Sequence, residues 1–297
     1  MNSRIDKLLI LCLIFVISLC SNIYSDENEW DLEIELAKQD FVLHERIWLD
    51  VTLTNTTSDT LRTHGLALPN HRQFTIELRD NNGNLIEYTG IKYSIASAPG
   101  RLLFEAGEQD YGCFNLLELF GSRERNSGYS VLDWRFPYIK EGMYTVQANF
   151  EGAISNKLTL NIVEPFGKEK EILKLIEKAS SIWAQDNTEP SAQIFQGIVD
   201  KYPISVFAEK CYYLSRIYNH MGKIREGTYD KRILKKELLI NFPNSGNSRN
   251  WLLAITYKLD DNEKIEIFNK FIEDYPNKRC SKFADQMRKR LLNKKGE

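Results

Sequence analysis

The four histidines are the first candidates for metal binding or acid–base chemistry in this sequence: His44, His64, His71 and His220. His64 and His71 are separated by six residues without a nearby cysteine, and this spacing matches no common metal motif. His44 precedes a glutamate but lacks the second histidine that a zinc protease helix carries four residues later. We therefore interpret all four as ordinary surface or boundary residues and predict no metal site.

The sequence also lacks the short motifs that mark common catalytic centres. It contains no Gly-x-Ser-x-Gly elbow, no glycine-rich phosphate loop before a helix and no dinucleotide-binding fingerprint. The segment from Asp80 to Asn84 is similar in composition to a calcium loop, but it lacks the glutamate at the twelfth position and is better explained as a turn. We predict no catalytic residue and no cofactor, and interpret the protein as a non-enzyme.

The first 25 residues differ from the rest of the chain. Arg4 and Lys7 precede an apolar run over residues 8–19, in which Ser18 is the one polar residue, and polar residues follow. A basic start, a short apolar middle and a small residue at the end are typical of a secretory signal. A membrane span needs about 20 apolar residues, so this run is too short for one. We predict a signal peptide over residues 1–25 and an exported protein, periplasmic or associated with the outer envelope.

The cysteines leave two alternatives open. Cys20 follows Leu19, where lipidation of exported proteins favours a small residue, and an acylated Cys20 would attach the protein to a membrane. Removal of the signal leaves Cys113, Cys211 and Cys280, too few for a disulfide framework. We interpret these three as small apolar packing residues, with a bond between Cys211 and Cys280 as the alternative.

Composition places the remainder among ordinary globular proteins. Of 297 residues, 27% are charged and 42% hydrophobic, and the length suffices for two domains with separate cores. The formal net charge of −2 argues against a nucleic-acid partner.

Residues 26–164 show the alternation of apolar and polar residues that is typical of half-buried strands. The clearest runs lie at 32–36, 47–53, 74–78, 144–150 and 158–162, and Asn82-Gly83 suits a tight turn. Residues 89–140 are less regular, and within them 113–120 fit either a strand or a short helix. Several short strands separated by turns predict a β-sandwich.

After Pro165 the apolar period changes to about 3.6, the period of helices. A motif with an aromatic residue before proline recurs at Phe195–Pro203, Lys235–Pro243 and Phe268–Pro276, which predicts helical repeats over residues 165–297. The helices after the first two prolines each carry leucine, a small residue and then tyrosine, and we expect the small residue at a close helix contact. The predicted repeat-packing positions are Leu214, Ser215, Tyr218, Leu253, Ala254 and Tyr257.

Both parts resemble known families. Leu49–Thr56, Ala106–Glu108 and Glu141–Val146 are similar to strands and turns of bacterial immunoglobulin-like modules, some of which resemble proteinase-inhibitor domains. The helical motif resembles the tetratricopeptide repeat of cell-envelope proteins, although Lys235 replaces an aromatic residue. The resemblance implies an all-β immunoglobulin-like sandwich followed by an all-α tetratricopeptide-like helical array.

These features lead to two hypotheses on function. The first is an exported scaffold or adaptor that binds a protein or peptide partner of the cell envelope through its helical repeats. The alternative is a protease inhibitor that acts through the β-sandwich and its irregular segment 89–140. The last helix carries eight basic residues against two acidic ones over 278–297, which fits either an acidic partner or the solvated outer face of a terminal repeat.

Overall fold

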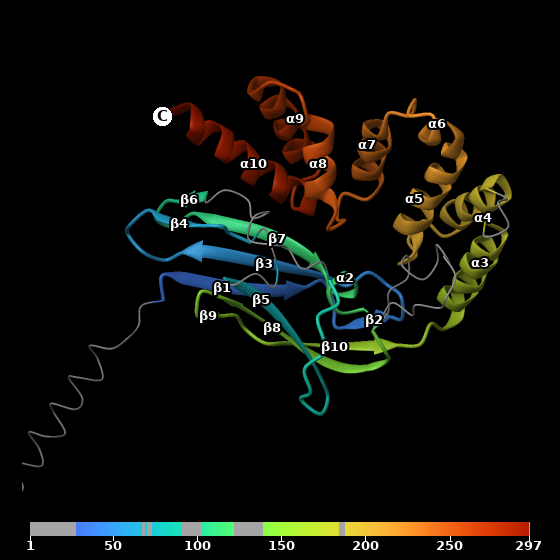
Figure 1. Ribbon diagram of the computed structural model, residues 1–297, viewed down its shortest axis with the longest axis horizontal. Coiled ribbons are helices and arrows are strands. Elements are labelled where there is room, and N and C mark those ends of the chain that lie inside the picture. Colours follow the sequence, from blue (N-terminus) through green and yellow to red (C-terminus); the bar gives the residue numbers. More distant parts are fainter. Residues whose placement is uncertain are drawn as a thin grey trace, which may run out of the picture.

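The computed structural model describes residues 28–66, 69, 73–90, 102–121, 139–183 and 188–296. The predicted signal peptide, Cys20 and His71 lie outside the described residues, as does most of the segment 89–140. Within the described part, a β region that includes one short helix, α2 (Leu116–Phe120), precedes a helical region along the chain (Figure 1). The prediction of a β part followed by a helical part is confirmed at that level.

The strands are β1 (Trp30–Leu36), β2 (Asp40–Val42), β3 (Trp48–Asn55), β4 (Leu61–Thr63), β5 (Phe74–Asp80), β6 (Leu102–Phe104), β7 (Gln109–Asn115), β8 (Gly142–Phe150), β9 (Ala153–Ile154) and β10 (Leu158–Val163). One sheet has the order β1-β3-β7 and is antiparallel throughout. The other has the order β2-β10-β8-β5, with β9 beside β8 and with β2 parallel to β10. Strands β4 and β6 form a separate pair.

The two sheets share one hydrophobic core because each presents its apolar alternate residues to the other. Leu49, Val51 and Leu53 of β3 belong to the same buried cluster as Val146 and Phe150 of β8. At one end of this core, the ring of Trp30 contacts Phe150 edge to face, with 5.4 Å between ring centroids. The predicted alternation therefore identifies the inward residues of both sheets.

Asn55 ends β3 with a fully buried amide that joins three chain segments. Its Nδ2 donates to the carbonyls of Asp59 (2.8 Å), Phe104 (3.0 Å) and Glu105 (3.1 Å), and its Oδ1 accepts from the backbone N–H of Thr57 (2.9 Å). We expect Asn55→Ala to lower the free energy of unfolding by about 2 kcal/mol, because buried carbonyls lose their donor. Urea denaturation measures the loss.

Asn161→Ala is the matched control, because Asn161 lies near the sheet edge and its amide donates to the exposed Asp40 (3.1 Å). Its expected effect is below about 0.5 kcal/mol. Equal losses for the two variants would contradict the structural role of Asn55.

The helices are α2 (Leu116–Phe120), α3 (Gly167–Trp183), α4 (Thr188–Lys201), α5 (Ala208–Asn219), α6 (Met221–Arg225), α7 (Lys231–Asn241), α8 (Ser248–Thr256), α9 (Asp261–Asp274) and α10 (Arg279–Gly296). The segment 113–120, which fitted a strand or a helix, divides between the two: β7 ends at Asn115, and the Asn115 side chain caps α2 by accepting from the Leu117 N–H. The change from strands to helices occurs between Val163 and Gly167, on either side of Pro165.

The aromatic-proline motif forms the same backbone turn three times, after α4, α7 and α9. In the first turn the Ser205 N–H donates to the Tyr202 carbonyl and the Ala208 N–H to Ser205, which starts α5. The same two bonds recur at Ser245 and Ser248 before α8, and at Lys278 and Ser281 before α10. Three sequence copies thus make one local structure, and each begins a helix that faces the sheet.

The helices lie along the outer face of sheet β1-β3-β7, with α10 closest to β7 and α3 continuing from β10 (Figure 1). Tyr111 and Cys113 on the outer face of β7 belong to an apolar cluster with residues of α7 to α10. A further cluster joins α3, α4 and α5, with Val42 of β2 packed against it. The sheet is therefore covered on both sides, by the second sheet and by helices.

Candidate binding cleft between the sheet and the helices

Arg46, Trp48 and Asp50 are alternate residues on the outer side of the sheet, at β3 and just before it. They contact three successive repeats of the helical part. Arg46 forms an ion pair with Glu209 at the start of α5. Trp48 lies against Gly246 in the turn before α8, and Asp50 pairs with Arg279 at the start of α10. Outward side chains of a strand repeat every second residue. One strand thus positions three repeats.

Asp50 is the most highly bonded residue of this interface. Its carboxylate accepts from Arg279 Nε at 2.8 and 3.1 Å and from Nη2 at 2.7 Å, and it also accepts from the hydroxyl of Tyr111. The Tyr111 ring contacts Phe283 of α10 with 4.7 Å between centroids. Burial, together with the charge of Asp50, raises the pKa of Tyr111 above its usual range, so this phenol stays protonated and donates.

Asp110 forms the second ionic contact, on the edge strand β7. Its buried carboxylate accepts from the Leu66 N–H at 2.8 Å and from Arg290 Nη2 of α10 at 2.9 Å, and it also accepts from Gln286. Both ion pairs join α10 to the sheet, and the pair between Arg46 and Glu209 adds an ionic contact at α5.

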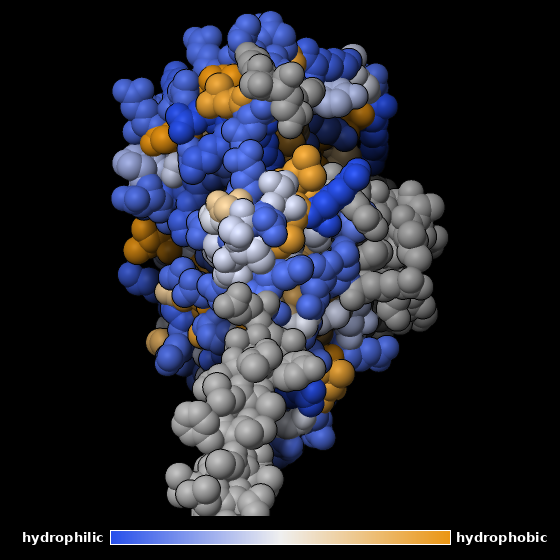
Figure 2. Space-filling model, turned by 90° about the vertical axis from the view of Figure 1, so that its left-hand side faces the viewer, coloured by the Kyte–Doolittle hydropathy of each residue, from blue (hydrophilic) through white to orange (hydrophobic). Residues whose placement is uncertain are grey.

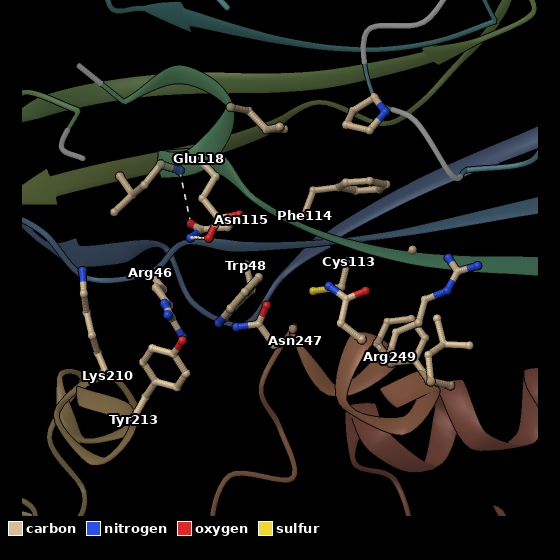
Figure 3. A pocket seen from close by; sticks show the side chains of 18 of the residues that line it. Arg46, Trp48, Cys113, Phe114, Asn115, Glu118, Lys210, Tyr213, Asn247 and Arg249 are labelled. Carbon is tan, nitrogen blue, oxygen red and sulfur yellow. Dashed lines mark hydrogen bonds between the residues drawn. The ribbon is translucent and has the colours of Figure 1, made fainter. Parts of the chain in front are cut away.

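At α5 and α8 the two parts enclose a cleft of about 760 Å³. In Figure 3, Arg46, Trp48 and Cys113 approach it from the sheet, while Lys210 and Tyr213 of α5 and Arg249 of α8 approach it from the helices. The remaining lining is mostly apolar or amide: Leu66, Phe114, Leu117, Leu214, Ile217, Asn247, Asn250, Leu253 and Phe283 are among it. A cavity of this size and mixed lining suits a small molecule or a short peptide segment.

The charges in the cleft are not evenly neutralised. Arg46 pairs with Glu209, and its guanidinium lies 5.8 Å from the centroid of the Trp48 ring. Glu118 of α2 accepts from Asn115 Nδ2 at 3.2 Å, at the opposite end of the view from Arg249 (Figure 3). Burial lowers the pKa of the half-buried Arg249. No ion pair joins Arg249 to an acidic residue of the described part, so this end of the cleft carries an unpaired positive charge.

The predicted packing positions of α5 lie inside the helical part. Leu214, Ser215 and Tyr218 are buried, and the Tyr218 ring stacks on Trp183 with 5.6 Å between centroids. The Ser215 hydroxyl donates to the Tyr212 carbonyl at 3.0 Å. Leu214 and Tyr218 also line the cleft.

The corresponding positions of α8 are displaced. Leu253 and Tyr257 are 50% and 69% exposed, and Ala254 is half-buried. The turn before α5 recurs before α8, and superposing the two turns places Leu214 opposite Ala254. The sequence pattern aligned Leu214 with Leu253, which is one residue away. Leu252 is the fully buried leucine of this helix instead. Leu253 therefore lines the cleft, although the sequence pattern predicted that it packs between helices.

The histidines and cysteines do not come together. Among the described residues, no group of three or more histidine, cysteine or acidic side chains is placed to hold a metal. His44 lines the cleft with a positive φ of 69°, and His220 stacks on Tyr229. Cys211 and Cys280 are both free thiols, so the alternative of a bond between them is wrong for this structure. Burial raises the pKa of the Cys211 thiol to about 12.

The basic residues of the last helix divide into two groups: Lys278, Lys282 and Lys289 are exposed, as a solvated outer face requires, whereas two arginines contact the sheet. Arg279 and Arg290 are neither solvated nor offered to a partner, because they pair with Asp50 and Asp110 of the sheet. Arg288 pairs with Asp285 within the helix at 2.6 Å. Part of the positive charge of α10 is thus neutralised by the β part of the same chain.

The face of the molecule shown in Figure 2 is mainly polar. On the face shown in Figure 2, apolar residues form small separate groups among hydrophilic ones. In the part of the chain that the structure describes, no helix combines the length and apolar character needed to cross a membrane.

Comparisons with known proteins add little. No family model and no curated protein matches the chain. Among solved structures, a β-glucosidase from Listeria innocua is 12% identical over 45% of this chain and 16% of its own, with a TM-score of 0.27. The DNA glycosylase AlkC from Pseudomonas fluorescens is 12% identical over 45% of this chain and 30% of its own, with a TM-score of 0.27. A CARDB domain from Pyrococcus furiosus is 11% identical over 46% of this chain and 94% of its own, with a TM-score of 0.24. Such low TM-scores carry no argument about function.

Proposed function

We propose that this protein is a non-catalytic adaptor that binds an extended segment of a protein partner in the cleft between sheet and helices. The observation that carries the proposal is the cleft itself, about 760 Å³ and lined from both parts of the chain. Its lining combines apolar side chains with the amides of Asn247 and Asn250 and the phenol of Tyr213. Apolar walls with a few polar groups suit a peptide, whose side chains pack while its backbone forms hydrogen bonds.

The same proposal includes the finer fold assignment, an immunoglobulin-like sandwich with a tetratricopeptide-like array. Two sheets around a common core support the first, and three copies of one turn support the second. In this arrangement α5, α8 and α10 face the sheet, so part of the surface that an array usually offers to partners is occupied by β3 and β7. The cleft near α5 and α8 is the part that remains for a ligand.

We also propose that the protein is exported and works in the cell envelope. The basic and apolar pattern of residues 1–25 supports this, and attachment to a membrane would require acylation of Cys20. The protease-inhibitor alternative depended on the segment 89–140, most of which lies outside the described residues. No contact of the described residues favours that alternative over the adaptor.

A cleft-filling substitution tests the adaptor function. We expect Leu253→Trp to weaken binding of an immobilised library of nine-residue peptides by about tenfold or more, because the indole would occupy space that the peptide needs. Leu292→Trp is the matched control, since Leu292 is 48% exposed on α10 and lies outside the cleft lining, against 50% for Leu253. The library first identifies the peptides that the full chain captures. Fluorescence anisotropy then measures how tightly the full chain and its variants bind the strongest of these peptides.

Two results would contradict the proposal. If the unmodified protein retains no peptide of the library, it is not a peptide-binding adaptor of this kind. If Leu253→Trp and Leu292→Trp bind the same peptides equally well, binding occurs elsewhere and the cleft is not the site.

A further inference from the structure

Arg249 differs from the other arginines at the contact between sheet and helices. Arg46, Arg279 and Arg290 each pair with an acidic residue. Arg249 lies in the first turn of α8 and reaches toward β7 (Figure 3). No described residue forms an ion pair or hydrogen bond with its guanidinium. A half-buried charge without a partner is unfavourable unless something else neutralises it.

The surroundings of Arg249 explain why the protein itself does not neutralise it. Asp110 is the acidic residue whose charge acts on Arg249. Its carboxylate oxygens already accept hydrogen bonds from Arg290, Gln286 and the Leu66 N–H. Burial lowers the pKa of Arg249, and the charge of Arg290 lowers it further while Asp110 opposes both. The guanidinium stays charged at neutral pH, and Arg249 is one of the residues that line the cleft.

We propose that Arg249 binds a carboxylate of the peptide that occupies the cleft, so that the site selects segments with an acidic side chain beside apolar ones. This inference rests on the proposed function and names the ligand class of the same site. A carboxylate matches the planar fork of a guanidinium and forms two parallel hydrogen bonds with it. Leu253, which is exposed in the cleft lining, would pack against an adjoining apolar residue of the peptide.

The charge balance favours a single carboxylate over a phosphate. Asp110 and Arg290 act on Arg249 with opposite charges that offset each other, so one positive charge is left for a ligand to neutralise. One guanidinium with one free positive charge is neutralised by one carboxylate.

The test uses the full chain and paired sets of immobilised nine-residue peptides, with glutamate or glutamine at the centre and apolar residues on either side. We expect the unmodified protein to bind the best glutamate peptide about tenfold or more tightly than its glutamine counterpart. Arg249→Met keeps the aliphatic volume, and it should bind both peptides alike. Arg249→Lys keeps the charge without the fork and should retain part of the preference.

Arg225→Met is the matched control, because Arg225 is exposed on α6 and lies outside the cleft lining. This control should keep the full preference for glutamate. Without peptide, Arg249→Met should melt at a higher temperature than the unmodified protein, since an unpaired buried charge is removed. If the Arg249 guanidinium only stabilised the fold, Arg249→Met would melt at a lower temperature than the unmodified protein.

The outcomes separate the two proposals. If the unmodified protein binds glutamate and glutamine peptides equally, or if Arg249→Met keeps the preference, the inference about Arg249 is wrong while the adaptor function stands. If Arg249→Met melts earlier or does not fold, Arg249 is a structural residue and the inference is equally wrong. If no peptide of either set binds, the adaptor function itself fails.

Discussion

Replacing Asp50 by asparagine is expected to lower the free energy of unfolding by about 4 kcal/mol. The Asp50 carboxylate accepts three hydrogen bonds of 2.7–3.1 Å from Arg279 and one from Tyr111, and the ion-paired side chains are each 12% exposed. Asparagine preserves the shape of the side chain but removes its charge. Arg279 would then be a buried cation without a counter-ion, which is the costly case. Urea denaturation followed by circular dichroism measures the loss.

Two further variants separate the ion pair from the general effect of losing an acidic residue. Asp50→Leu combined with Arg279→Met removes both charges and should be within about 2 kcal/mol of the unmodified protein. Asp230→Asn removes an exposed partner of Arg232 and should cost at most about 1 kcal/mol. If Asp50→Asn is no more harmful than Asp230→Asn, Asp50 does not hold α10 to the sheet.

Replacing Gly246 by alanine is expected to cost about 3 kcal/mol, because the turn before α8 touches the outer face of β3. A Cβ at Gly246 would lie 2.1 Å from Cε3 and 2.4 Å from Cδ2 of the Trp48 indole, far inside the normal contact distance. The ring cannot move away easily, since it is a large planar group with Arg46 over it. The turn or the sheet must therefore shift, and thermal and urea unfolding should both show the loss.

Changing Trp48, the side chain that lies against Gly246, tests the cause of the loss of stability in Gly246→Ala. Trp48→Leu in the Gly246→Ala background should recover part of the stability, because the smaller side chain leaves room for the added methyl group. Gly197→Ala is the matched control: Gly197 lies inside α4, and apart from its chain neighbours and the backbone of its own helix no atom lies within 4 Å of the added Cβ. Alanine there should stabilise the protein by about 0.5–1 kcal/mol. A Gly246→Ala variant as stable as the unmodified protein would show that this contact is loose.

Sequence patterns predicted the local elements well where one local rule decides them. The alternation over Leu49, Val51 and Leu53 marks the inward side of β3, and the proline after Tyr202 marks a turn that recurs twice. The patterns did not place Leu253, whose environment depends on how α8 is rotated against the sheet. A shift of one residue turns a helix by about 100°, enough to exchange a helix contact for a cleft position.

The sequence by itself determined the order of the two structural classes, the inward faces of the strands and the three repeated turns, because each depends on neighbouring residues. Only the tertiary structure decided what covers the outward face of β3. Asp50 and Arg279 are 229 residues apart, and Asp110 and Arg290 are 180 apart. A period of two residues distinguishes the two faces of a strand, but an outward acid has the same pattern whether water or a distant arginine lies opposite. The cleft and the unpaired Arg249 exist only because those distant pairs bring the helices onto the sheet.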